Sequence, residues 1–153
     1  APSSGLIVAL DDLRDPGNLG TIIRLCDWFG IADLVCSPTT VDCYNPKVVQ
    51  ASMGSLSRVT VHYLPLKPYL SSQKVPVYGT YMDGHSVYES NLTTEGILIL
   101  GNEANGISEH LSALIQHKIA IPQFGTQQDT ESLNVANAAA IFLSEFKRRT
   151  IEK

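Results

Sequence analysis

The chain has 153 residues, of which 44% are hydrophobic and 17% are charged, and its formal net charge is −4. This composition is that of an ordinary globular protein with one core, and no apolar run approaches the ~20 residues that a membrane span needs. The acidic balance argues against a domain that grips nucleic acid through a broad basic surface. Any polyanionic partner must be held locally, or by something outside this chain.

Three cysteines, Cys26, Cys36 and Cys43, lack the Cys-x-x-Cys spacing and lie in apolar or strand-like contexts. They predict buried thiols in a reducing compartment, and we therefore expect a cytoplasmic protein. The four histidines are scattered, so no metal site is predicted. Residues 1–5 lack the features of a signal peptide and are expected to be a linker or an edge segment, with residues 6–153 forming one domain.

Short apolar runs alternate with helical patterns along the whole chain. Continuous apolar runs are typical of strands that are covered on both faces, as in the middle of a parallel sheet. Strands are predicted over residues 6–10, 32–36, 58–64, 75–82, 96–101 and 118–121. The fourth strand is expected to end near Thr80, before a turn at Asp83-Gly84, and residues 96–101 are expected to form a central strand.

The segments between these strands have the apolar spacing and the end signals of helices. A first helix follows the turn at residues 15–18, and Gly30 is suited to end it. Asn45-Pro46 is an Asn cap followed by Pro at the first helical position, which starts a short helix. This short helix is expected over residues 46–53. Further helices are predicted over residues 68–73, over 108–116 with a cap at Ile107-Ser108, and from residues 132–134 to Lys147-Arg148-Arg149.

The last helix follows a polar loop over residues 123–131 and begins with small residues, which let another backbone or a ligand approach closely. Ser132 or Asn134 can cap this helix by accepting a hydrogen bond from its free N–H groups. The apolar spacing predicts a buried face. Its members are Leu133, Val135, Ala136, Ala139, Ala140, Leu143 and Phe146.

Strands alternating with helices predict an α/β fold with a mostly parallel sheet flanked by helices, in which ligands bind beyond the carboxyl ends of the strands. Three junctions with Asn and Gly beside charged residues are expected at such ends, namely residues 15–20 with Arg24, residues 101–106 and residues 132–140. We therefore expect them to form one site. The chain lacks the glycine-rich dinucleotide fingerprint, the P-loop motif and the Gly-x-Ser-x-Gly elbow, which argues against nucleotide binding of those kinds and against a serine hydrolase.

The three junctions have a common order and spacing in one known family. Their residues are Asn18-Leu19-Gly20 with Arg24, then Leu100-Gly101-Asn102-Glu103-x-x-Gly106-Ile107, then Ser132-Leu133-Asn134-Val135-x-x-Ala138. This set resembles the three motifs of the SpoU/TrmH family of RNA ribose 2′-O-methyltransferases, within the SPOUT superfamily, over essentially the whole chain. The resemblance implies S-adenosylmethionine as methyl donor and a C-terminal deep trefoil knot that builds the cofactor pocket. It also implies a homodimer in which the first motif of one subunit helps to complete the site of the other.

The resemblance further implies which residues form the site. The reaction side would consist of Asn18, Arg24, Glu103, Ser132 and Asn134. The donor side would consist of Thr80, Gly101, Asn102, Ile121 and Leu133. Gly101 would let the backbone come close, and Ile121 and Leu133 would sandwich the adenine. The alternative for each of these donor-side residues is a plain place in the core.

Arg24 interrupts an apolar helix segment, residues 22–26, where a guanidinium is costly unless it is paired or used. Because arginine stays protonated, we expect it to grip the phosphate beside the target ribose and to stabilise the developing alkoxide, and not to act as a free base. An ion pair with Asp27 or Glu103 is the structural alternative. Glu103 in turn could fix Arg24 or Asn18, or could serve only its own loop.

Ribosomal RNA is the expected substrate and transfer RNA is the alternative, with an N-terminal RNA-binding domain expected outside this chain and no membrane partner. A catalytically silent RNA-binding module of the same fold is a further alternative, and the intact reaction-side residues argue against it. Asn18 and Arg24 argue against a base-methylating SPOUT enzyme. A Rossmann-like oxidoreductase would bind a nicotinamide instead, and it is the least favoured alternative.

Overall fold

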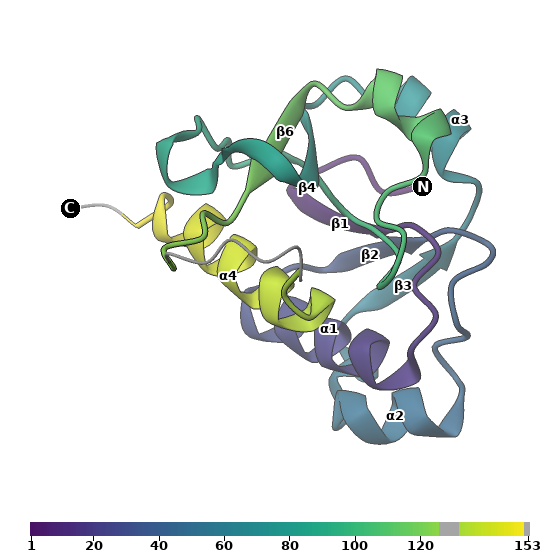
Figure 1. The fold of residues 1–153 in the computed structure, drawn as a ribbon. Helices are drawn as coiled ribbons and strands as arrows, with labels where there is room; N and C mark the ends of the chain where they lie inside the picture. Colours follow the sequence, from purple (N-terminus) through teal and green to yellow (C-terminus); the bar gives the residue numbers. More distant parts are fainter. Residues whose placement is uncertain (126–131, 152–153) are drawn as a thin grey trace.

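The strands form one parallel sheet with helices on both faces, seen in a computed structural model that describes residues 1–125 and 132–151 (Figure 1). The sheet has six strands in the order β3-β2-β1-β5-β4-β6, and every neighbouring pair is parallel. The strands are β1 (Leu6–Leu10), β2 (Asp33–Cys36), β3 (Thr60–Tyr63), β4 (Val77–Ser86), β5 (Gly96–Leu100) and β6 (His117–Ala120). The predicted parallel α/β fold is therefore confirmed, while the knot stays a prediction.

Helices cover the sheet on both sides. The elements on one side are α1 (Pro16–Trp28) and α4 (Val135–Arg148), with α2 (Pro46–Ser52) packed against α1 (Figure 1). The elements on the other side are α3 (Leu66–Ser72) and the 3₁₀ helix η3 (Glu109–Leu114). Two further short 3₁₀ helices are η1 (Ser55–Ser57) and η2 (Val87–Glu89). None of the helices described is long and apolar enough to cross a bilayer.

The central strands are buried on both faces, which explains their continuous apolar sequences. In β1, Leu6, Val8 and Leu10 pack into the core under α1 and α4. The alternate residues Ile7 and Ala9 pack into a second core under α3 and η3. β5 lies between β1 and β4 and is buried along its whole length, so the predicted central position of this strand is confirmed.

Helix ends follow the local signals of the sequence. The side chain of Asn45 caps α2 by accepting a hydrogen bond of 2.9 Å from the N–H of Lys47, with Pro at the first helical position. Gly30 follows α1 at a φ of 70°, which glycine adopts without strain. Of the two candidate caps for α4, the side chain of Asn134 is the one that accepts bonds from the helix N–H groups, at 2.9 and 3.2 Å.

The predicted turn at Asp83-Gly84 is wrong, because β4 continues through both residues. Its register with β6 shifts between Thr80 and His85, so the strand is irregular there without ending. A Cβ atom on Gly84 would lie only 2.7 Å from the backbone carbonyl carbon of Ile119. The glycine is therefore needed for close strand contact, and its role depends on a strand that is distant in the sequence.

Two details of the predicted helices are also corrected. The predicted helix over residues 108–116 is the shorter 3₁₀ helix η3, and the side chain of Ser108 makes no capping bond. Leu133 precedes the cap of α4, so it lies outside the buried stripe, and 52% of its surface is exposed. Most of the predicted polar loop over residues 123–131 lies outside the described residues. The buried residues of α4 are Ala136, Ala139, Phe142, Leu143, Glu145 and Phe146.

A buried carboxylate, Glu145, secures the C-terminal end of α4. It accepts hydrogen bonds from Arg148 at 2.7 Å and from Arg149 at 2.8 Å, and only 7% of its side chain is exposed. Arg149 also donates to backbone carbonyls of residues 87, 88 and 90, in and after η2. The hydrogen bond from Arg148, followed by that from Arg149, lowers the pKa of Glu145 from 4.5 to about 2.

We expect Glu145→Gln to lower the free energy of unfolding by about 1–2 kcal/mol at pH 7. A carboxyl group whose folded pKa is depressed stabilises the protein above its unfolded pKa of 4.5, and this contribution is lost as the pH falls toward about 2. The difference between wild type and variant should therefore shrink at pH 3, in urea unfolding at both pH values. If the two proteins differed in free energy of unfolding by the same amount at pH 3 and at pH 7, the ionised Glu145 would not be the source of the stabilisation.

Candidate functional site

Side chains from the three predicted junctions meet at the carboxyl edge of the sheet. The amide of Asn134, which caps α4, donates to the side-chain oxygen of Asn18 in α1 at 3.1 Å. The amide of Asn18 donates in turn to Glu103, which follows β5, at 3.5 Å. The prediction that the three junctions come together is confirmed by these contacts. The chemical roles of the residues stay predictions.

Glu103 organises the start of α1. Its carboxylate accepts backbone hydrogen bonds from Asp15 at 2.7 Å and from Arg14 at 3.1 Å. Asp15 caps α1 by accepting a bond of 2.9 Å from the N–H of Asn18. Glu103 was expected to fix Arg24 or Asn18, or to serve only its own loop. The structure shows its contact to Asn18, and it also shows contacts to the loop before α1. The residue thus positions Asn18 through both its side chain and its helix.

We expect Glu103→Gln to lower the free energy of unfolding by about 1–2 kcal/mol, because a neutral amide accepts weaker hydrogen bonds from the two backbone N–H groups. Urea unfolding at pH 7 measures the loss. The matched control is Glu109→Gln, since Glu109 is an exposed acid whose side chain accepts a long hydrogen bond from Ser112 at 3.4 Å. Equal losses in the two variants would show that Glu103 does not hold the start of α1.

A tight loop after β5 packs on Gly101. The backbone N–H and carbonyl of Asn102 pair with the carbonyl and N–H of Gly106, both at 3.0 Å. The side chain of Asn102 accepts bonds from the N–H groups of residues 104 and 105 and donates to the carbonyl of Asp12 at 2.7 Å. A Cβ on Gly101 would lie 2.2 Å from the carbonyl carbon of Gly106. The predicted close approach at Gly101 is present, and the backbone that approaches is the chain's own.

The other predicted donor-side residues lie in three places, which are within β4 beside the carboxyl end of β5, directly after β6, and ahead of α4. β4 lies between β5 and β6, so the carboxyl ends of these strands share one edge. Thr80 is half-buried in β4, and its hydroxyl donates to the carbonyl of Ile99 at 3.2 Å. Ile121 follows β6 and is partly buried against the core, whereas Leu133 is mostly exposed ahead of α4. The core alternative therefore fits Ile121 in part and does not fit Leu133.

Arg24 makes no hydrogen bond or ion pair with Asn18, Glu103 or Asn134. It is exposed on the outer face of α1, and it has no polar partner among residues 1–125 and 132–151. The structural alternative, an ion pair of Arg24 with Asp27 or Glu103, is not present, because Asp27 pairs with Arg58 at 2.8 Å and Glu103 binds the loop before α1. The expected cost of an arginine among apolar residues is absent, since its apolar neighbours face inward and the guanidinium faces solvent.

Two acids after β1 belong to the site and were not predicted as members of it. Asp11 is only 4% exposed, and its carboxylate accepts a hydrogen bond of 2.6 Å from the N–H of Ser108. Asp12 has a φ of 59° and receives the side-chain amide of Asn102 on its carbonyl. A hydrogen bond from Arg14 lowers the pKa of Asp12. The sequence feature that could have identified these two residues as members of the site is their position as a pair of acids directly after a buried strand.

The cysteines are not reactive thiols, although Cys36 ends β2 at the carboxyl edge of the sheet. All three are buried and unpaired, as predicted. Burial raises the pKa of the Cys26 thiol to about 12, so a thiolate is strongly disfavoured. Within the described part of the chain, no group of three His, Cys, Asp or Glu side chains could hold a metal ion.

The chain resembles proteins that methylate RNA. It is 35% identical to a Bacillus subtilis 23S rRNA (guanosine(2553)-2′-O)-methyltransferase, over 90% of this chain and 56% of that enzyme. It is 32% identical to a Thermus thermophilus tRNA (guanosine(18)-2′-O)-methyltransferase, over 96% of this chain and 76% of that enzyme. The chain therefore spans only part of these relatives, and about half of the first.

Solved structures of RNA methyltransferases are also similar to this chain. A Porphyromonas gingivalis protein, described as a member of the TrmH family, superposes with a TM-score of 0.89 and 45% identity, over 97% of this chain and 61% of that one. An rRNA methyltransferase from Sinorhizobium meliloti with AdoMet bound superposes with a TM-score of 0.88 and 30% identity, over 99% and 59%. The profile of the SpoU rRNA Methylase family matches residues 5–144, which include the contacts that join Asn18, Glu103 and Asn134. The chain belongs to this SpoU family.

Proposed function

We propose that this chain transfers a methyl group from S-adenosylmethionine to the 2′-hydroxyl of a ribose in RNA, with ribosomal RNA as the substrate. The link from Asn134 through Asn18 to Glu103 carries the proposal, because it joins the three family junctions at the edge where parallel sheets bind ligands. The rRNA-modifying relatives and the AdoMet-bound structure support it. The Thermus relative makes transfer RNA the second candidate. We also propose a cytoplasmic location, which agrees with either substrate.

The residues at this edge fit an adenosyl group. Ile121 and Leu133 are apolar side chains that the protein leaves partly or largely uncovered, which suits the two faces of an adenine ring. Backbone groups around Thr80 and Gly101 would hold the rest of the molecule, and Asn102 keeps its loop in shape. When bound, S-adenosylmethionine supplies an electrophilic methyl group.

On the reaction side, the ribose hydroxyl has to be oriented toward that methyl group and helped to lose its proton. The amides of Asn18 and Asn134 orient the ribose, and the exposed hydroxyl of Ser132 bonds the ribose or the carboxylate of the donor. Glu103 positions Asn18. These groups share a short stretch of the sheet edge, whereas Arg24 lies about 9 Å farther along α1 from Asn18.

We propose that Arg24 acts in the site of the partner subunit of a homodimer whose interface includes α1 and α4. The support is its exposure and its lack of a polar partner among the described residues, together with the alignment of α1 beside α4 (Figure 1). In the partner's site its guanidinium binds the phosphate beside the target ribose and stabilises charge that develops on the ribose oxygen.

Calorimetric titration with S-adenosylhomocysteine, run beside light scattering, tests the cofactor and the dimer together. Micromolar binding to a dimer is expected. Methyl transfer to unmodified 23S rRNA and tRNA transcripts then identifies the substrate, and resistance of the product to alkaline cleavage identifies the 2′-oxygen. A well-folded dimer that binds no S-adenosylhomocysteine would contradict catalysis and favour a silent RNA-binding module. Alkali-sensitive product would indicate base methylation.

A further inference from the structure

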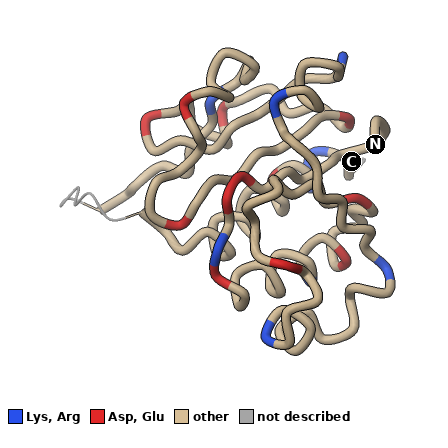
Figure 2. Tube along the Cα trace, turned by 90° about the vertical axis from the view of Figure 1, so that its right-hand side faces the viewer, with Lys and Arg blue, Asp and Glu red and all other residues tan. Residues whose placement is uncertain are grey.

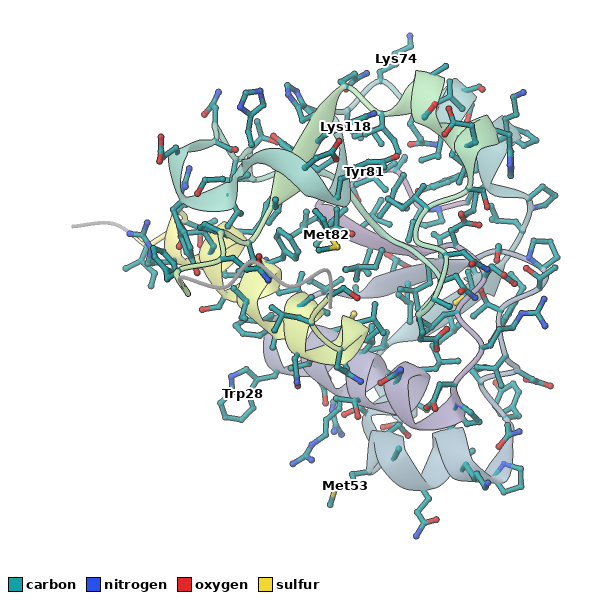
Figure 3. All side chains as sticks on the ribbon, viewed as in Figure 1. Trp28, Met53, Lys74, Tyr81, Met82 and Lys118 are labelled. Atoms are coloured by element: carbon teal, nitrogen blue, oxygen red, sulfur yellow. The ribbon has the colours of Figure 1, made fainter. Side chains whose placement is uncertain are left out.

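The outer face of α1 and residues 53–58, which follow α2 and include η1, enclose an open hollow of about 390 Å³ that the proposed mechanism leaves largely unused. It is lined by Arg24, Asp27, Trp28, Met53, Ser55 and Arg58. Trp28 is 83% exposed and Met53 is 67% exposed, and both project away from the body of the protein (Figure 3). Large exposed apolar side chains that cluster on a surface commonly mark an interaction site.

The charges in this hollow favour an anion. Its one carboxylate, Asp27, is bound by the guanidinium of Arg58 at 2.8 Å and by the hydroxyl of Ser55 at 2.9 Å, and the bond from Arg58 lowers its pKa. Arg24 remains without a polar partner among the described residues. The hollow therefore carries one uncompensated positive charge. The rest of the trace mixes basic with acidic residues and shows no continuous basic face in the view of Figure 2.

Trp28 and Arg24 lie on the same exposed stripe of α1. They are separated by one helical turn, which is about 6 Å along the helix axis. Their side chains are thus neighbours on a solvent-facing surface, with an indole ring beside a free guanidinium. A flat aromatic surface beside a cation matches the base and the phosphate of a nucleotide.

We propose that this hollow binds a nucleotide of the substrate RNA that flanks the target, with its base stacked on Trp28 and its phosphate bonded to Arg24. The proposal rests on the proposed function, because Arg24 is assigned there to the phosphate beside the target ribose. It adds a base-stacking surface that contacts neither the donor nor the reacting oxygen. Stacking of this kind tolerates any base, so the surface contributes affinity more than sequence specificity.

Trp28 is the only tryptophan of the chain, so its fluorescence reports on the hollow directly. Titration of the protein with a single-stranded oligoribonucleotide should quench this fluorescence as a base stacks on the indole. Trp28→Ala should raise the KM for the RNA transcript about 10-fold while leaving kcat and S-adenosylhomocysteine affinity unchanged. Trp28→Phe should recover most of that loss. The matched control is Tyr44→Ala, since Tyr44 is 76% exposed and lies outside the hollow.

Two results would overturn the proposal. Binding of a labelled oligoribonucleotide, seen by anisotropy, without a change in Trp28 fluorescence would show that the base does not stack there. Conversion of the dimer to a monomer by Trp28→Ala, seen by light scattering, would assign the surface to a second copy of the chain. The fluorescence titration needs no methyl transfer, so a failure of the proposed reaction would remain distinguishable from a failure of the stacking surface.

Discussion

Arg24→Ala is expected to lower kcat for methyl transfer by about 10²- to 10³-fold, the loss typical of removing one group that stabilises developing negative charge. The free energy of unfolding should change by less than about 0.5 kcal/mol, because the side chain is exposed and has no polar partner in the described part of the chain. Single-turnover methyl transfer and urea unfolding measure the two effects. Lys74→Ala removes an exposed cation that follows α3 and serves as the control (Figure 3).

Mixing two variant subunits tests directly whether Arg24 acts in the site of the partner subunit. Asn134→Asp keeps the side-chain oxygen that caps α4 and removes the amide donor to Asn18. If Arg24 serves the partner's site, mixing Arg24→Ala subunits with Asn134→Asp subunits creates one intact site in each mixed dimer. Activity should then reappear on mixing two nearly inactive proteins. Mixed dimers that form and stay inactive would show that Arg24 serves its own subunit.

Gly101→Ala should destabilise the protein by about 3 kcal/mol or more, at the upper end of the cost of overpacking. Its Cβ would lie 2.2 Å from the carbonyl carbon of Gly106 and 2.3 Å from the nitrogen of Ile107, and these backbone atoms cannot rotate away as a side chain does. The loop over residues 102–106 would have to move, and Glu103 with it. We therefore also expect the affinity for S-adenosylhomocysteine to fall, as measured by calorimetry.

Gly106→Ala is the matched control for that substitution. Gly106 has a φ of 71°, but a Cβ at this position would meet no atom within 4 Å. The expected cost is therefore only about 1–2 kcal/mol of backbone strain. Urea unfolding of both variants separates close packing from backbone conformation. Equal losses in Gly101→Ala and Gly106→Ala would contradict the role assigned to the contact on Gly101.

Features that depend on neighbouring residues were predictable from the sequence. The apolar runs at residues 6–10 and 96–101 specify strands buried on both faces, because alternate side chains of each run pack into the two cores. Asn45 and Asn134 cap helices through N–H groups two or three residues ahead. The three junctions could be assigned to one edge because the carboxyl ends of parallel strands share it. Hydrogen bonds between nearby residues and the spacing of apolar residues along the chain determine these features.

Features that depend on distant segments were decided only by the tertiary structure. Asp83-Gly84 has the composition of a turn, yet Gly84 is needed because the backbone of Ile119 lies against it. Glu103 binds backbone groups 88 and 89 residues earlier in the chain, and this separation hides its role in starting α1. The sequence by itself determined the parallel sheet, the succession of strands and helices along the chain, and the set of residues at one edge of the sheet. Packing between distant segments decided which side chains touch there and which, like Arg24, face outward.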